Sequence, residues 1–239
     1  MSRSPTHGIA ICLLGLAFLF ASLPAHAQSR NRAPGFSSLD KGSSVLVMTP
    51  DVELFSISAG GLIEPKADWT ETAQRYLQEA LRKKMSALIL NTQFLSEKDG
   101  DAFADISALH AAVAQSISLH HMSGAHLKLP TKNDQLDWSL GEAVIPIREQ
   151  LGADYALFVW LRDSYASSER KVAMIALALL GVGIGGGMQI GYASLVDLRT
   201  GQVMWFNRLL RGSGDLREQD PAVETVNTLL DDFPGVATK

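Results

Sequence analysis

The order in which strand-like and helix-like segments follow one another most constrains how this chain can fold. Short apolar runs, typical of buried strands, alternate with segments whose apolar residues recur every three or four positions, as on a buried helix face. The predicted strands are 44–48, 53–58, 87–90, 154–161, 191–197 and 203–209, and the predicted helices are 69–85, 101–124, 139–151 and 220–233. We therefore expect the α/β (α+β) class: a single-domain sandwich with a mixed β-sheet flanked by helices, a closing antiparallel hairpin and a C-terminal helix.

Two of the predicted helices begin with a capping box, in which side chains satisfy the free backbone amides of the first turn. Asp68 stands three residues before Glu71, and Ser139 stands three residues before Glu142. Gly152 follows the second of these helices, and glycine commonly ends helices because it adopts the left-handed conformation without strain. We expect these residues to set the helix ends.

The start of the chain has the features of a cleavable secretory signal peptide. Arg3 supplies a positive charge, residues 9–23 are apolar, and residues 24–27 read Pro-Ala-His-Ala. This places small residues at the two positions that a signal peptidase reads. We expect cleavage before Gln28 and, because the protein is exported, a periplasmic location.

The rest of the chain divides by composition. Residues 28–42 are rich in Ser, Arg, Asn, Gly and Pro, which is typical of a flexible segment. We expect a signal peptide over 1–27, a flexible leader over 28–42, one α/β domain over 43–234 and a tail over 235–239.

Cysteine content and charge exclude several classes of protein. The only cysteine, Cys12, lies in the segment that we expect to be removed. The mature chain then carries no disulfide, thiolate-bound metal or cysteine nucleophile, so its stability must come from core burial. The net charge is −4 and the longest basic run is residues 82–84, so a nucleic acid is not expected as a partner.

Histidines supply the candidate metal ligands. His120, His121 and His126 could meet around one ion, since imidazole is a common ligand, although their spacing matches no known metal motif. A hydrolase or metal-binding protein that uses these three residues is therefore one alternative. His110 falls on the apolar stripe of its predicted helix, where a core histidine with a hydrogen-bond partner is the commoner case.

Other catalytic motifs are weak. Residues 181–186 match G-x-G-x-x-G, but a helix-like segment precedes them and a strand follows, the reverse of a dinucleotide site. The sequence contains no G-x-S-x-G nucleophile turn. We therefore expect no cofactor and no catalytic site, and we interpret the chain as a protein that is not an enzyme.

Residues 172–196 contain no charged side chain, which leaves three alternatives. The run could be core, it could be an exposed apolar segment that meets neighbouring subunits or a membrane, or residues 172–190 could form an inner-membrane anchor. The second alternative has specific candidate contact residues: Leu177, Leu179, Leu180, Val182, Ile184 and Met188.

One segment resembles a known family. Residues 191–207 read GYASLVDLRTGQVMWFN, in which a strand ends in Asp197, turns through Thr200 and Gly201, and returns through Trp205. This is similar to the closing hairpin of the CsgG / TolB amino-terminal-like envelope proteins, and residues 151–157 resemble the helix-to-strand join of the same group. Because Asp197 can bond turn amides and Gly201 can adopt the left-handed conformation, the hairpin has a structural role.

The resemblance implies a periplasmic protein without catalytic activity that acts through contacts, often as an oligomer. We expect a scaffold or accessory subunit in secretion or envelope assembly, with protein partners of the bacterial envelope and copies of itself. Peripheral membrane contact and association with the outer membrane are further expectations. The sequence has no cysteine at the cleavage point and no pair of long alternating segments, so neither a lipid anchor nor a pore is expected.

Overall fold

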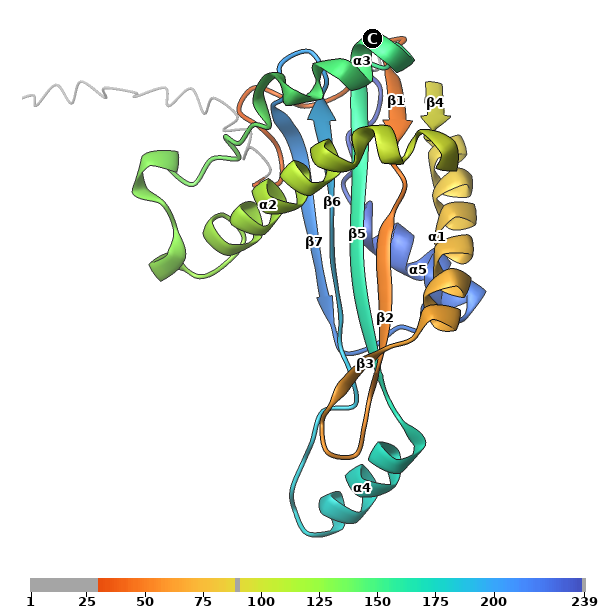
Figure 1. The fold of residues 1–239 in the computed structure, drawn as a ribbon. Helices are drawn as coiled ribbons and strands as arrows, with labels where there is room; N and C mark the ends of the chain where they lie inside the picture. Colours follow the sequence, from red (N-terminus) through yellow and green to blue (C-terminus); the bar gives the residue numbers. More distant parts are fainter. Residues whose placement is uncertain (1–29, 89–90, 238–239) are drawn as a thin grey trace, which may run out of the picture.

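A mixed sheet of seven strands forms the centre of the protein, which confirms the predicted fold class (Figure 1). The computed structural model describes residues 30–88 and 91–237. The predicted signal peptide and cleavage site lie outside the described residues. The strands are β1 Ser44–Val47, β2 Asp51–Ile57, β3 Ile63–Pro65, β4 Asn91–Phe94, β5 Tyr155–Ala166, β6 Gln189–Asp197 and β7 Val203–Arg211.

Strand β5 is central to the sheet. It has 12 residues, and β1 and β2 follow one another along one of its edges, both parallel to it. Antiparallel β6 occupies the other edge of β5 and pairs in turn with β7. Beyond this centre, β4 pairs in parallel with β1, and β3 pairs antiparallel with β2.

The break between β1 and β2 has a local cause. Val47 lies opposite Leu157 and Asp51 lies opposite Trp160, so this edge carries one residue more than β5 between the two points. Such an extra residue bends a strand, and Pro50, which has no backbone N–H, cannot continue the ladder. The two predicted strands, 44–48 and 53–58, are thus separate strands that share β5 as a partner.

Helices cover both faces of the sheet. They are α1 Ala67–Ala87, α2 Ala104–His120, α3 Ile145–Leu151, α4 Ser168–Leu179 and α5 Gln219–Leu229. Side chains of β5 alternate between the faces, as the pleat of a strand requires. Leu157 and Leu161 belong to a core shared with α1 and α5, and Phe158 belongs to a second core shared with α2 and α3. In Figure 1, α2 crosses in front of β5, β6 and β7, and α5 lies behind β2.

The leader is packed, which corrects the expectation of a flexible segment for residues 30–42, and residues 235–237 pair with it. The backbone N–H of Ala33 donates to the carbonyl of Met204 (2.9 Å) in β7. Leu39 is fully buried, and its N–H donates to the carbonyl of Gly235 (2.9 Å). The leader thus covers the edge of β7, which would otherwise be an open sheet edge. The polar composition of the leader gave no indication of this pairing.

Two other local predictions were wrong. Residues 87–90 were expected as a strand, but α1 continues to Ala87 and the strand is β4; residues 89–90 lie outside the described part. Asp68 is not a cap, because α1 begins at Ala67 after an extended Lys66 and has no side-chain cap. Asp68 instead lies in the first turn, where its charge favours the helix dipole.

The third predicted helix departs from the prediction at its start and agrees with it at its end. The Ser139 Oγ accepts the N–H of Gly141 (2.9 Å), but a 3₁₀ turn, Gly141–Val144, precedes α3. Pro146 lies in the first turn of α3, where a missing N–H is tolerated. Gly152 ends the helix with φ of 67°, as its sequence position indicated.

The closing hairpin joins β6 and β7. The Asp197 carboxylate accepts the N–H of Arg199 (2.7 Å), and the Thr200 hydroxyl accepts the N–H of Gln202 (3.2 Å). Gly201 has φ of 73°. Trp205 is fully buried and packs edge-on against Phe233, with ring centroids 5.2 Å apart.

Gly201 provides a test of the hairpin. A Cβ at this position would lie 2.1 Å from the carbonyl oxygen of Gly141, whereas a Cβ at left-handed Gly152 would meet open space. Gly152→Ala should lower the free energy of unfolding by about 1 kcal/mol, the cost of the left-handed conformation. Gly201→Ala should lower it by roughly 3 kcal/mol because a backbone clash adds to that cost. Urea denaturation of both variants measures the difference, and equal losses would show that the close approach to Gly141 is unimportant.

Candidate functional site

The segment between β5 and β6 projects beyond the end of the sheet (Figure 1). We call residues 168–188, which comprise α4 and the loop that follows it, the flap. Ser167 caps α4, with its hydroxyl accepting the N–H of Arg170 (3.2 Å). The Arg170 guanidinium donates to the carbonyls of Gly185 (3.0 Å) and Ser58 (3.2 Å), and so ties the base of the flap to the turn after β2.

The surface of the flap is apolar and exposed. Every residue of α4 is exposed or half-buried, and Leu179 and Leu180 are 84% and 78% exposed. Among the predicted contact residues, Leu179, Leu180, Val182 and Met188 are exposed, and Leu177 and Ile184 are half-buried. An exposed apolar run of this length without charges is unusual on a monomeric soluble protein. The structure therefore favours the exposed-segment alternative.

The other two alternatives for this run are corrected. Core packing holds only for its last part, residues 189–196, which belong to β6; residues 172–188 lie outside the core. Residues 172–190 do not form a membrane-spanning helix in this structure, because α4 has 12 residues and ends at Leu179, whereas a spanning helix needs about 20. Within the described ranges, the single helix that is long and apolar enough to span a membrane is Asp101–His120. Its Ile106, Ala114 and Ile117 belong to the same apolar core as Phe158 of β5.

A second apolar surface lies on the sheet itself, on the face that α2 covers only in part. Where α2 no longer covers the sheet, this face carries Trp160 from β5, Ile190 from β6 and Leu210 from β7. Between them and the last turns of α2, near Leu119, lies a groove of about 340 Å³. We call this surface the bare face.

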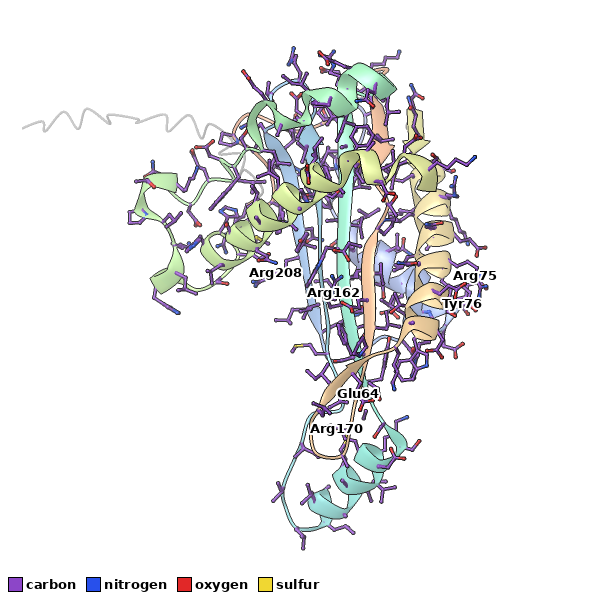
Figure 2. The ribbon with its side chains drawn as sticks, in the orientation of Figure 1. Glu64, Arg75, Tyr76, Arg162, Arg170 and Arg208 are labelled. Carbon is purple, nitrogen blue, oxygen red and sulfur yellow. The ribbon has the colours of Figure 1, made fainter. Side chains whose placement is uncertain are left out.

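The arginines of the bare face already have partners. Arg208 donates to the carbonyls of Ser118 and Met122, both at 3.1 Å, and so holds the end of α2. Arg162 pairs with Asp51 (2.8 Å) and lies over the Trp160 ring, 4.6 Å from its centroid. Figure 2 shows both arginines on the sheet below α2. The bare face therefore offers mainly apolar surface, on which the charge of Arg162 is paired and the N–H groups of Arg208 have carbonyl acceptors.

The three candidate metal ligands do not form one site. The His120 Nδ1 lies 2.8 Å from the carbonyl oxygen of Leu127, and the His121 Nε2 lies 2.7 Å from the carbonyl oxygen of Arg30. His126 lies in a separate 3₁₀ turn. Over residues 30–88 and 91–237, no group of three or more His, Cys, Asp or Glu side chains could hold a metal ion. The described residues thus give no support to the metal-dependent alternative.

His110 is a buried core residue, as its place in the apolar stripe indicated. Its ring stacks on Phe158 with centroids 4.0 Å apart, and its Nε2 forms a hydrogen bond with the Ser194 hydroxyl. Burial lowers the pKa of His110 from 6.5 to about 3, so the ring is neutral at physiological pH. A substrate cannot reach this pair because both residues are buried.

Asp163 is a second buried group with a shifted pKa, and sequence reasoning missed it. Its carboxylate accepts hydrogen bonds from the Tyr165 hydroxyl and from the Gln189 amide (2.6 Å). Burial raises the pKa of Asp163 from 3.8 to about 6, although these hydrogen bonds act in the opposite direction. The Tyr165 hydroxyl in turn accepts the N–H of Leu216 (2.7 Å), so the group links β5 to the segment before α5.

His110 and Asp163 are buried, while the flap and the bare face are open to solvent. Sequence reasoning found the flap from its lack of charge. It missed the bare face because no local pattern tells where a helix from another part of the chain stops covering a sheet.

Comparison with known proteins gives only loose likenesses. No family model matches the chain, and no curated protein matches it. Among solved structures, the PelC dodecamer from Paraburkholderia phytofirmans matches with a TM-score of 0.40 and 13% identity, covering 84% of this chain and 93% of that one. The LpoB C-terminal domain from Salmonella enterica matches with a TM-score of 0.30 and 13% identity, covering 75% and 87%.

Lipoprotein GNA1162 from Neisseria meningitidis matches with a TM-score of 0.31 and 12% identity, covering 80% of this chain and 94% of that one. Likenesses of this size do not establish a family or a function.

His110 and Asp163 make opposite contributions to the pH dependence of stability. Unfolded His110 takes up a proton below pH 6.5 but folded His110 only near 3, so His110 lowers stability as the pH falls through this window. Folded Asp163 keeps its proton up to about pH 6 and unfolded Asp163 only to 3.8, so its contribution to stability is lost as the pH rises between these values.

Single variants should separate the two contributions. Between pH 4 and 6, Asp163→Asn should make the slope of unfolding free energy against pH more positive than in the wild type, by about 1.4 kcal/mol per pH unit. His110→Asn should make it more negative by about the same amount. Urea denaturation at several pH values measures both slopes, and slopes equal to the wild-type slope would show that these groups titrate normally.

Proposed function

We propose that this chain is a non-catalytic accessory protein of the bacterial envelope that works by assembling with copies of itself and with other envelope proteins. The observation that carries the proposal is the flap, whose apolar residues from Val172 onward lie outside the core. The predicted signal peptide supports export, and the hairpin's resemblance to the CsgG / TolB amino-terminal-like group supports a role through contacts. Membership of that group is itself part of the proposal.

The flap is suited to bind a protein surface. Exposed apolar area favours association by about 25 cal/mol for each Å² removed from water, so Leu179, Leu180, Val172 and Ile175 together provide a strong drive. The run from residue 172 to 196 has no charge, so covering it buries no unpaired ion.

The bare face of a second copy is the surface that matches the flap. Its groove is lined by Trp160, Ile190 and Leu119. Arg162 is ion-paired with Asp51, and Arg208 keeps its charge while it donates to carbonyl oxygens of its own chain. The uncharged part of the flap adds no second charge to this surface, and Arg208 already has hydrogen-bond acceptors within its own chain. The volume of the groove, about 340 Å³, is enough for a few aliphatic side chains.

This contact joins two different patches of the chain. A contact between unlike patches is heterologous: repeated from copy to copy, it closes into a ring or continues as a filament. Each copy then uses its flap once and its bare face once. The proposal thus predicts that damage to either patch stops assembly.

Complementation between two variants tests the proposal. Leu179→Asp with Leu180→Asp disables the flap, and Leu119→Asp disables the groove on the bare face. Each variant alone should have the mass of one chain by size-exclusion chromatography with light scattering, because a charge in a dry interface is costly. An equimolar mixture should form a 1:1 complex that grows no further, since it retains one intact flap and one intact groove.

The control is Leu109→Asp, which changes an exposed leucine of the same helix, α2, outside the groove lining. It should assemble as the wild type does. A mixture that stays monomeric, or a groove variant that still assembles, would contradict docking of the flap on the bare face. A wild-type chain that stays monomeric but floats with lipid vesicles would show that the flap binds a membrane instead.

A further inference from the structure

A cavity lies where β1 and β4 end, apart from both the flap and the bare face. The two strands are adjacent and parallel, with Ser44 opposite Asn91 and Val47 opposite Phe94, so their carboxyl ends share one edge of the sheet. Figure 1 shows the two arrowheads side by side and pointing the same way. The cavity has a volume of about 510 Å³, within the range of small-molecule sites.

The chain leaves these two strands toward opposite faces of the sheet. After β1 it passes through β2 and β3 to α1, which packs in the core shared with α5. After β4 it passes through two 3₁₀ turns to α2, which packs in the other core. In sheets with parallel strands, a crevice opens where neighbouring connections diverge in this way, and ligands bind there. The position of the cavity is therefore a consequence of the topology.

The charged side chains that line the cavity are both cations. Arg82 comes from α1 and Lys98 from the turn after β4. Neither forms an ion pair within the described part of the chain, and no described carboxylate lines the cavity. Asp99, which accepts the Ser96 hydroxyl (2.6 Å), lies outside the lining.

The Arg82 guanidinium has a defined position. It lies over the Phe94 ring, with its central carbon 4.3 Å from the ring centroid. A guanidinium held by its flat side keeps its N–H edges free, and these edges match the two oxygens of a carboxylate or phosphate. The side-chain amide of Gln78 is half-buried in the same lining and has no hydrogen-bond partner in the described ranges.

We propose that this cavity binds a small organic anion. Arg82 and Lys98 would bind its carboxylate or phosphate, Gln78 would hydrogen-bond its polar body, and Met48, Pro50 and Leu95 would contact its apolar part. The site goes beyond the assembly role and does not depend on it, because its lining includes no residue of the flap or the bare face.

Isothermal titration calorimetry on the mature chain tests the site with three hexoses that differ in charge. Glucose 6-phosphate and glucuronate carry the two candidate anionic groups, and glucose carries none. At least one anion should bind, and glucose should not. If glucose 6-phosphate binds more tightly than glucuronate, the site prefers a phosphate; the reverse order shows that it prefers a carboxylate. Arg82→Gln and Lys98→Gln should each weaken binding about tenfold, the usual effect of losing one charge-assisted hydrogen bond.

Arg75→Gln is the matched control, because Arg75 is also an arginine of α1 that lies over an aromatic ring, that of Tyr76, outside the cavity lining (Figure 2). Its affinity should equal that of the wild type. Circular dichroism verifies that each variant is folded, and amide chemical shifts should change around residues 47–50, 78–82 and 94–98. Absence of binding by both anions, equal binding of glucose, or equal weakening by Arg75→Gln would overturn the proposal.

Discussion

The pairing of β5 along both of its edges is the interaction on which the rest of the structure depends. One edge bonds to β1 and then to β2, and the other bonds to β6 over nine residue pairs. Because side chains of β5 alternate between two faces, the same strand contributes to both apolar cores. The closing hairpin extends this pairing to β7, and the leader then covers the edge of β7.

The exposed surfaces arise because the central strands are longer than the helices that cover them. β5 and β6 extend further than α2 and α3 reach, so one face of the sheet is left without a helix at that end. Polar strand residues there have partners within the chain: Arg162 pairs with Asp51, and Arg208 bonds to carbonyls at the end of α2. The chain then crosses from β5 to β6 through the flap, which has no helix against which to bury its apolar side chains. The same ladder that builds the core thus presents both surfaces that we assign to assembly.

Local chemistry could be predicted from the sequence, and long-range pairing could not. Asp197 and Gly201 specify the hairpin because a turn depends on residues close together in the chain. The expected end of β5 at Leu161 was five residues too early, because Arg162 and Asp163 look like loop residues until their tertiary partners are known. Leu39 was assigned to a flexible leader because its partner, Gly235, lies at the other end of the sequence. The candidate site divides in the same way: absence of charge indicated the flap, and only the fold revealed the bare face and the cavity.

The central claim is that the flap is covered when the protein assembles. Because the only cysteine lies in the predicted signal peptide, a mature chain with Leu179→Cys can carry one environment-sensitive dye on the flap, and Leu109→Cys gives a control position on α2. The account predicts that the flap dye shifts to the blue as protein concentration rises, in step with the increase in mass by light scattering, while the control dye does not. Emission from the flap that stays characteristic of water while the mass increases would contradict it.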